Sequence, residues 1–127
     1  MKKVLVVDDM DHWLVRCRIP LEMAGYETIE AKTAEQAIAA YLGDNPDAVL
    51  CDLRFIDHKD ETGLQIGSEI RRLEKEGSLP RRYMVLMSQD HVPEGKWKPA
   101  GYDAFFDKIY FEGRSERLIR LLEGAGV

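Results

Sequence analysis

Short apolar runs alternate along this chain with longer segments whose apolar residues return at helical spacing. Runs that contain almost no polar residue are typical of strands buried on both faces of a parallel sheet. The run from Glu27 to Ala31 alternates weakly between apolar and polar residues, which is typical of a short strand. The pattern predicts strands at Lys3–Val7, Glu27–Ala31, Ala48–Asp52, Tyr83–Met87 and Ala104–Phe106.

The segments between these strands carry signals of helix starts and stops. Thr33 with Gln36, and Thr62 with Gln65, have the spacing of a capping box, in which the two side chains satisfy the first free amides of a helix. Between residues 89 and 101, prolines and glycines leave room for about two helical turns at most. Helices are expected from 11 to 24, from Thr33 to 42, from Thr62 to a stop at Gly77, and from 113 to 123.

Five strands that alternate with helices predict a doubly wound α/β domain, with helices on both faces of one parallel sheet and right-handed crossovers. The 127 residues are enough for one such domain, so we expect a single domain over 1–127.

Composition and charge argue against several classes of function. The net charge of −5 argues against nucleic acid as the direct partner, because phosphate binding requires a basic face. No apolar run approaches the roughly 20 residues that span a bilayer, and the run after Met1 is too short for a signal peptide. Cys17 and Cys51 have no metal-binding spacing, and Cys51 is expected to be a small core residue in a reducing cytoplasm.

Polar residues stand where the apolar strands end. Because parallel strands place their carboxyl ends along one edge of the sheet, the side chains of Asp8, Asp9, Asp52, Ser88 and Lys108 are expected there together. Crowded carboxylates repel one another unless a cation intervenes, and Mg²⁺ takes one or two of them while it keeps water and phosphate ligands. With an ammonium and a hydroxyl nearby, the set suits phosphoryl transfer to a carboxylate. For each residue alone, a polar group that merely ends a strand or caps a turn remains the alternative.

In this order, these residues resemble those of receiver domains of two-component response regulators, and the resemblance covers the whole chain. Asp8-Asp9 match the family's acidic pair, Asp52 in Leu50-Cys51-Asp52-Leu53 matches its phosphoacceptor, Ser88 its hydroxyl residue and Lys108 its lysine. The resemblance implies a flavodoxin-like sheet of strand order 2-1-3-4-5 with a short or irregular fourth helix. It also implies a cytoplasmic signalling module rather than an enzyme with a separate substrate.

The resemblance assigns metal and acceptor roles residue by residue. Asp52 would accept a phosphoryl group from the histidine of a sensor kinase or of a phosphotransfer protein. Asp9 would bind Mg²⁺ directly, Asp8 would support it through water, and the backbone carbonyl of Arg54 would be a third protein ligand.

The resemblance also assigns a switch. Lys108 would pair with the phosphoryl group, and Ser88 would bond one of its oxygens and shift. Phe106, matched to the family's switch aromatic, would then rotate inward. Only residues 124–127 follow the last predicted helix. We therefore expect a stand-alone receiver that acts through a downstream protein, through a second copy of the chain or by passing the phosphoryl group on.

The chain departs from the family at four places. Ile109 stands where a proline usually follows the lysine, so a trans peptide and a rerouted loop are expected. The loop from Arg54 to Glu61 holds about three extra residues relative to the family. Gln89 replaces a small residue after Ser88, and prolines interrupt the helix that follows.

Two charged residues flank the predicted site, since Arg54 lies two positions past Asp52 and Asp90 two positions past Ser88. Family members tune phosphoryl lifetime at these positions. Our hypothesis is that Arg54 pairs with Asp90 or reaches the phosphoryl group. The alternative is two solvated charges, which contribute little.

Two other functions stay open from the sequence. The first is a divergent receiver that serves as a phosphorylation-independent adaptor, which the four departures favour. The second is a Mg²⁺-dependent phosphatase with an aspartyl nucleophile, which the loose match of Asp9-Met10-Asp11 suggests. Trp13 stands where such enzymes need a small residue, and spacing does not decide whether it faces the core or the acidic pocket.

Overall fold

A computed structural model describes residues 1–55 and 61–127. Its strands form one five-stranded parallel sheet in the order β2-β1-β3-β4-β5. This is the flavodoxin-like order predicted from the sequence. The strands are β1 (Lys3–Val7), β2 (Glu27–Ala31), β3 (Ala48–Asp52), β4 (Tyr83–Ser88) and β5 (Ala104–Asp107).

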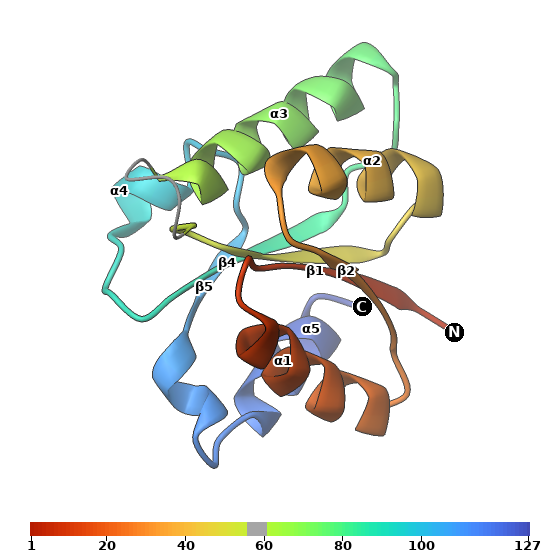
Figure 1. The fold of residues 1–127 in the computed structure, drawn as a ribbon. Coiled ribbons are helices and arrows are strands. Elements are labelled where there is room, and N and C mark those ends of the chain that lie inside the picture. Colours follow the sequence, from red (N-terminus) through yellow and green to blue (C-terminus); the bar gives the residue numbers. More distant parts are fainter. Residues whose placement is uncertain (56–60) are drawn as a thin grey trace.

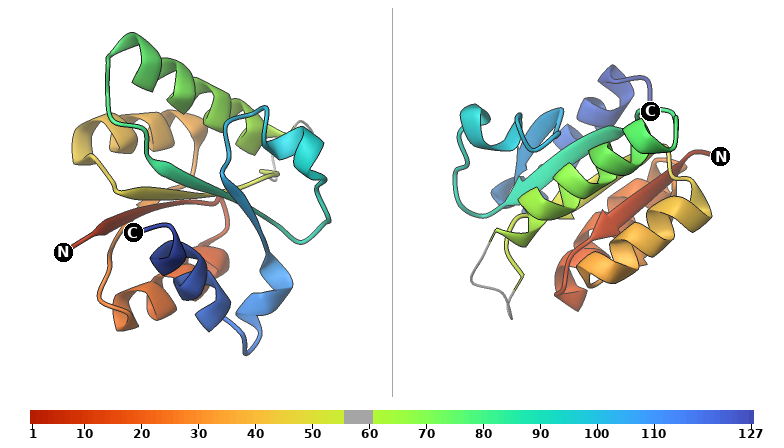
Figure 2. Two further views of the ribbon diagram at one scale, coloured as in Figure 1. Left: turned by 180° about the vertical axis from the view of Figure 1, so that it is seen from behind. Right: turned by 90° about the horizontal axis from the view of Figure 1, so that it is seen from above.

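Helices cover both faces of the sheet, as predicted (Figure 1). The front and rear views both place α2 and α3 on one face and α1 and α5 on the other, with α4 near the start of α3 (Figure 2). The helices are α1 (Asp11–Met23), α2 (Ala34–Asp44), α3 (Thr62–Glu76), α4 (Glu94–Trp97) and α5 (Glu116–Gly124), with a 3₁₀ helix η1 at Lys108–Phe111. None of the helices in these ranges is long and apolar enough to cross a bilayer.

The central strands are buried on both sides, which explains their unbroken apolar runs. Alternate residues of each strand point to opposite faces, so the sheet separates two apolar clusters. Leu5, Val7 and Cys51 belong to the cluster under α2 and α3. Val6 and Leu50 belong to the cluster under α1 and α5.

The Thr33 half of the first predicted capping box is confirmed, the Gln36 side chain accepts from the Lys32 amide instead of the Thr33 amide, and the second box is wrong. The Thr33 hydroxyl accepts a hydrogen bond from the Gln36 amide at 3.0 Å, and α2 begins at the next residue. In α3, Thr62 is already the first helical residue, and the N-cap Glu61 makes no side-chain capping bond. Thr62 thus lies one position too late in the chain to be the N-cap.

The short fourth helix is confirmed, because α4 is a single turn of four residues. The last helix begins three residues later than predicted, at Glu116 instead of Gly113. Gly113 has a φ of +85°, which lies in the left-handed region and is incompatible with the first turn of a right-handed helix.

The chain after β5 takes a different course from the one a proline would impose. The described residues contain no cis peptide bond, so the peptide before Ile109 is trans, as predicted. Lys108 opens the 3₁₀ helix, and the Asp107 carboxylate caps it by accepting from the Ile109 amide at 3.0 Å. The extra residues predicted between Arg54 and Glu61 fall mainly on 56–60, which lie outside the described residues.

Candidate functional site

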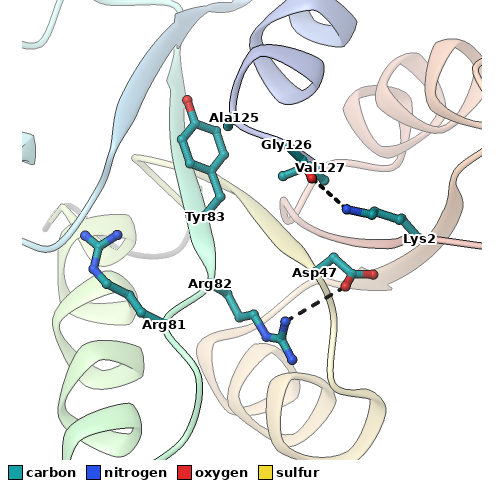
Figure 3. Close-up of a pocket in the computed structure, with 8 residues that line it drawn as sticks. All are labelled: Lys2, Asp47, Arg81, Arg82, Tyr83, Ala125, Gly126 and Val127. Carbon is teal, nitrogen blue, oxygen red and sulfur yellow. Dashed lines mark hydrogen bonds and ion pairs between the residues drawn. The ribbon is translucent and has the colours of Figure 1, made fainter.

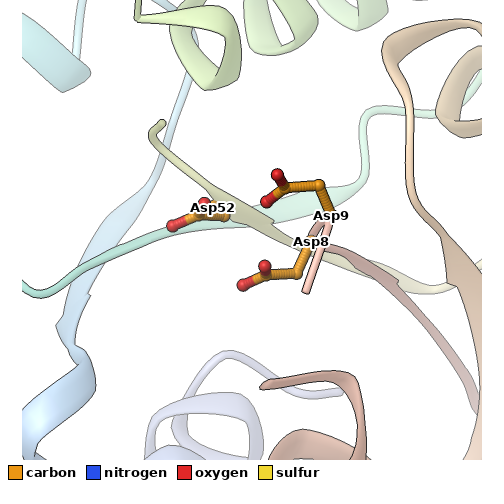
Figure 4. A group of neighbouring side chains, drawn as sticks. All are labelled: Asp8, Asp9 and Asp52. Atoms are coloured by element: carbon orange, nitrogen blue, oxygen red, sulfur yellow. The ribbon is translucent and has the colours of Figure 1, made fainter. Parts of the chain in front are cut away.

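Three carboxylates meet at the carboxyl edge of the sheet (Figure 4). Asp52 is the last residue of β3, and Asp8 and Asp9 directly follow β1, its neighbour in the sheet. One oxygen from each of the three side chains lies within 4.8 Å of the others. Parallel pairing of β1 with β3 therefore brings together the acidic residues that the sequence placed at this edge.

Lys108 completes this cluster from the end of β5. Its Nζ lies 2.7 Å from Asp8 Oδ2 and 2.9 Å from Asp52 Oδ1. The lysine is only 3% exposed, so the two ion pairs are shielded from water. Ile109 in place of proline thus leaves the ammonium in contact with the predicted acceptor.

Burial changes the acid–base behaviour of both carboxylates that contact the lysine. Loss of solvent raises the pKa of Asp52 to about 6, although the adjacent ammonium of Lys108 acts in the opposite direction. Burial likewise raises the pKa of Asp8, and Lys108 again opposes the shift. The Lys108 ammonium therefore offsets only part of the free energy that it costs to bury the charged forms of Asp8 and Asp52.

The donor set fits a hard divalent cation. Asp8, Asp9 and Asp52 present carboxylate oxygens close enough to share one ion, and oxygen is the ligand atom that Mg²⁺ prefers. Among Asp8, Asp9, Asp52 and Lys108, the negative charges outnumber the positive one, so an added cation lowers the electrostatic repulsion.

Ser88 lies at the same edge, as the last residue of β4, and is buried. Its Oγ accepts a hydrogen bond from the Asp90 amide at 3.0 Å. The Asp90 amide thus uses one lone pair of the Ser88 oxygen, and the Ser88 hydroxyl can still donate its own proton.

Charged residues surround the mouth of the site. Arg54 Nη2 lies 3.6 Å from Glu61 Oε1, and Arg54 Nε lies 4.0 Å from Asp90 Oδ2. Glu61 also pairs with Lys96 of α4. The Arg54–Asp90 contact expected from the sequence is present, but it is long and both side chains are more than half exposed, so it contributes little by itself.

The assignment of the switch to Phe106 does not fit the geometry. Its ring is already buried, in the apolar cluster under α1 and α5, where it packs on Tyr110 and Phe111. Leu86 of β4 faces the opposite cluster, and by strand alternation Ser88 faces the same way as Leu86.

Phe105 is the aromatic residue on the Ser88 side, and the sequence analysis missed it. It is partly buried against the cluster under α2 and α3 and makes an edge contact with His91, three residues past Ser88. The period-2 alternation of β5 could have found it, because neighbours on adjacent strands share a face and Phe105 pairs with Leu86.

Gly63 is a second residue of the site that the sequence analysis missed. It lies at the start of α3, where a Cβ atom would come within 2.1 Å of the Asp52 carbonyl oxygen. The Gly63 amide donates to the Leu53 carbonyl at 2.8 Å, and its own carbonyl accepts from the Tyr102 hydroxyl at 2.5 Å. Only a residue without a side chain lets α3 pack this closely on the acceptor strand.

A separate pocket lies at the opposite, amino-terminal edge of the sheet (Figure 3). Its basic side chains already have partners: Lys2 donates to the Gly126 carbonyl, Arg81 pairs with Asp103, and Arg82 lies 3.9 Å from Asp47. The chemistry-bearing residues predicted from the sequence all lie at the other edge.

Sequence comparison links the chain to signalling proteins. It is 32% identical over 79 residues to the phosphate regulon transcriptional regulatory protein PhoB of Pseudomonas aeruginosa, a match that covers 62% of this chain and 33% of PhoB. It is 29% identical over 123 residues to hybrid signal transduction histidine kinase L of Dictyostelium discoideum, covering 93% of this chain and 7% of the kinase. The chain thus spans a third or less of either relative. No family model matches it.

Structural comparison gives matches over nearly the full chain. The response regulator TrrA of Thermotoga maritima, solved in complex with Mg(2+)-BeF, superposes with a TM-score of 0.81 over 98% of both chains at 22% identity. NtrX of Brucella abortus superposes with a TM-score of 0.77 at 27% identity, over 98% of this chain and 27% of NtrX. The chain therefore has the fold of these two proteins over nearly its full length.

Proposed function

Since this chain is a receiver domain of the response-regulator type, we propose that it works in a phosphorelay and that Asp52 is its phosphoacceptor. The donor would be the phosphohistidine of a sensor kinase or of a histidine phosphotransfer protein. The observation that carries the proposal is the contact of Asp52 with Lys108 beside two further carboxylates.

In the proposed reaction, a carboxylate oxygen of Asp52 attacks phosphorus. A phosphorus–oxygen bond forms, the phosphorus–nitrogen bond breaks, and its electron pair stays on the histidine nitrogen. Lys108, already 2.9 Å from Asp52 Oδ1, compensates negative charge on the moving group. The buried Ser88 hydroxyl donates to a phosphoryl oxygen.

Asp9 and Asp52 would hold Mg²⁺ directly, Asp8 would support it through water, and the backbone carbonyl of Arg54 would be the third protein ligand. When bound, the ion supplies positive charge that offsets repulsion between the phosphoryl oxygens and the carboxylates. The chain's own residues supply position: parallel pairing of β1 and β3 fixes the acidic groups, and Gly63 lets α3 pack against the acceptor strand.

The proposal makes the chain a signalling module in the cytoplasm that modifies only itself. Its output would be a changed surface for a downstream protein or for a second copy of the chain. The phosphatase alternative is disfavoured by Asp11, whose carboxylate pairs with Lys32 and is 78% exposed, away from a shared site with Asp9.

The experiment is mass spectrometry of the protein after incubation with acetyl phosphate and Mg²⁺. We expect a hydroxylamine-labile phosphoryl adduct in the wild type and none in Asp52→Asn. Asp44→Asn, at an exposed position at the end of α2, is the matched control and should keep the adduct. Bound Mg²⁺ without an adduct would favour the phosphorylation-independent adaptor instead.

We further propose that Arg54 sets the lifetime of the adduct. Its guanidinium lies between Glu61 and Asp90 at the mouth of the site, from where it can turn to a phosphoryl oxygen. Dephosphorylation of Arg54→Ala should then be faster than that of the wild type, and equal rates would contradict this role.

A further inference from the structure

The structure answers a question about Trp13 that sequence spacing left open. Trp13 lies in the first turn of α1 and is 5% exposed. Its ring is part of the wall of the acidic site, because the Lys108 ammonium lies 4.5 Å from a Trp13 ring centroid. The ammonium thus contacts two carboxylates and one aromatic face.

An aromatic face attracts a cation through the ring quadrupole, and the attraction grows where water is excluded. Lys108 is almost completely buried, so this condition is met. A long lysine side chain has many rotamers, and contact with a fixed ring restricts it to those that reach Asp52. The indole also shields the ammonium from water, which strengthens both ion pairs.

The ring itself is held from two elements. Phe111, the last residue of the 3₁₀ helix that Lys108 opens, packs on Trp13 with ring centroids 6.0 Å apart. Phe111 in turn packs on Phe106 of β5 at 5.1 Å. On its own helix, the Arg16 guanidinium carbon lies 4.8 Å from a Trp13 ring centroid. Trp13 therefore connects α1 to the segment that carries the lysine.

We propose that Trp13 is a positioning residue, whose aromatic face holds the Lys108 ammonium against Asp52 before the phosphoryl group arrives. The phosphoryl part of this inference rests on the proposed function. The contact between ring and ammonium does not, and it is measured separately.

The test compares Trp13→Phe, which keeps an aromatic face, with Trp13→Leu, which keeps only apolar bulk. Trp97→Leu, the same change in α4, is the matched control. The first measurement is the NMR shift of the Lys108 ε-methylene in ¹³C-lysine-labelled protein, assigned with Lys108→Arg. The second is the rate of phosphorylation by acetyl phosphate at saturating Mg²⁺. The third is Mg²⁺ affinity by calorimetry.

We expect the Lys108 signal to lie upfield of the other lysines in the wild type, in Trp13→Phe and in Trp97→Leu, but not in Trp13→Leu. The phosphorylation rate of Trp13→Leu should fall roughly three- to tenfold, the factor that corresponds to a partly desolvated cation–π contact. Trp13→Phe should retain most of the rate, and all variants should bind Mg²⁺ as the wild type does.

Other outcomes overturn the proposal in distinguishable ways. A Lys108 signal without an upfield shift in the wild type contradicts the contact. Equal rates in the Leu and Phe variants, or a Mg²⁺ affinity that falls together with the rate, would show that Trp13 only supports the fold. A shifted signal in a wild type that takes up no phosphoryl group would refute the proposed function, and with it the positioning role.

Discussion

The Ile109 amide donates a 3.0 Å hydrogen bond to the Asp107 carboxylate, so the two neighbours of Lys108 are tied together across it. A proline at 109 could not make this bond, because it has no amide hydrogen. The rerouted chain thus has its own means of fixing the lysine that contacts Asp52.

Ile109→Pro should therefore destabilise the protein. It removes the capping bond, and a proline disfavours helical backbone at the preceding residue, which here is Lys108 at the start of the 3₁₀ helix. We expect a loss of about 1–3 kcal/mol in the free energy of unfolding, measured by urea denaturation. Ile109→Ala retains the amide at this exposed position and should lose far less; equal losses would contradict the explanation.

Asp52→Asn should stabilise the metal-free protein at neutral pH. The folded-state pKa of Asp52 is raised from 3.8 to about 6, so folding favours the protonated acid. The stability that comes from the preference of the fold for protonated Asp52 is fully present below about pH 4. It is lost as the pH rises through about 6. In urea denaturation with EDTA, the variant should exceed the wild type by about 1–3 kcal/mol at pH 7.5. The difference should shrink towards pH 4, and a difference independent of pH would refute this assignment.

Mg²⁺ should stabilise the wild type, because a ligand that binds only the folded state shifts the unfolding equilibrium. At 100 times the dissociation constant, the gain is about 2.7 kcal/mol. The gain in thermal stability should diminish below about pH 6, where protons compete for Asp52, and EDTA should reverse it. Asp9→Asn should lose most of it and Asp44→Asn none. If Mg²⁺ stabilised Asp9→Asn as much as the wild type, the ion would have to bind at a different site.

Gly63→Ala should be strongly destabilising, because the added Cβ would lie 2.1 Å from the Asp52 carbonyl oxygen. Either α3 or the end of β3 must move, and we expect a loss of about 3 kcal/mol or more with a slower phosphorylation of Asp52. The control is Gly43→Ala in α2, where no atom lies within 4 Å of the new Cβ. That change should stabilise the protein by up to about 1 kcal/mol. Similar thermal midpoints for both variants would contradict the close approach.

Strand positions could be predicted from the pattern itself, because unbroken apolar runs report burial on both faces. The strand order came from the resemblance to receiver domains. The acidic cluster followed from parallel pairing, which places the carboxyl ends of the strands along one edge. Helix ends were less accurate where one backbone feature decides them. Gly113 takes a positive φ, and Thr62 lies inside the first turn of α3 rather than before it.

The missed residues depend on contacts between segments that are far apart in the sequence. Gly63 shows its role only when α3 lies on β3, and Trp13 only when η1 brings Lys108 under its ring. Phe105 could have been predicted, because the alternation along β5 places it on the same face of the sheet as Ser88. The match to the family's switch aromatic selected Phe106, which lies on the other side of the sheet.

The sheet also divides the site between its two faces. The contacts of Lys108 with Asp8, Asp52 and Trp13 lie on the α1 side, whereas Phe105 packs on the α2–α3 side. Natural variation can therefore act on the two sides separately. Under the proposed function, changes on α1 would alter how fast Asp52 reacts, whereas changes around Phe105 would leave the contacts of Lys108 in place. The α2–α3 side of the site can therefore vary while the contacts of Lys108 with the two carboxylates are preserved.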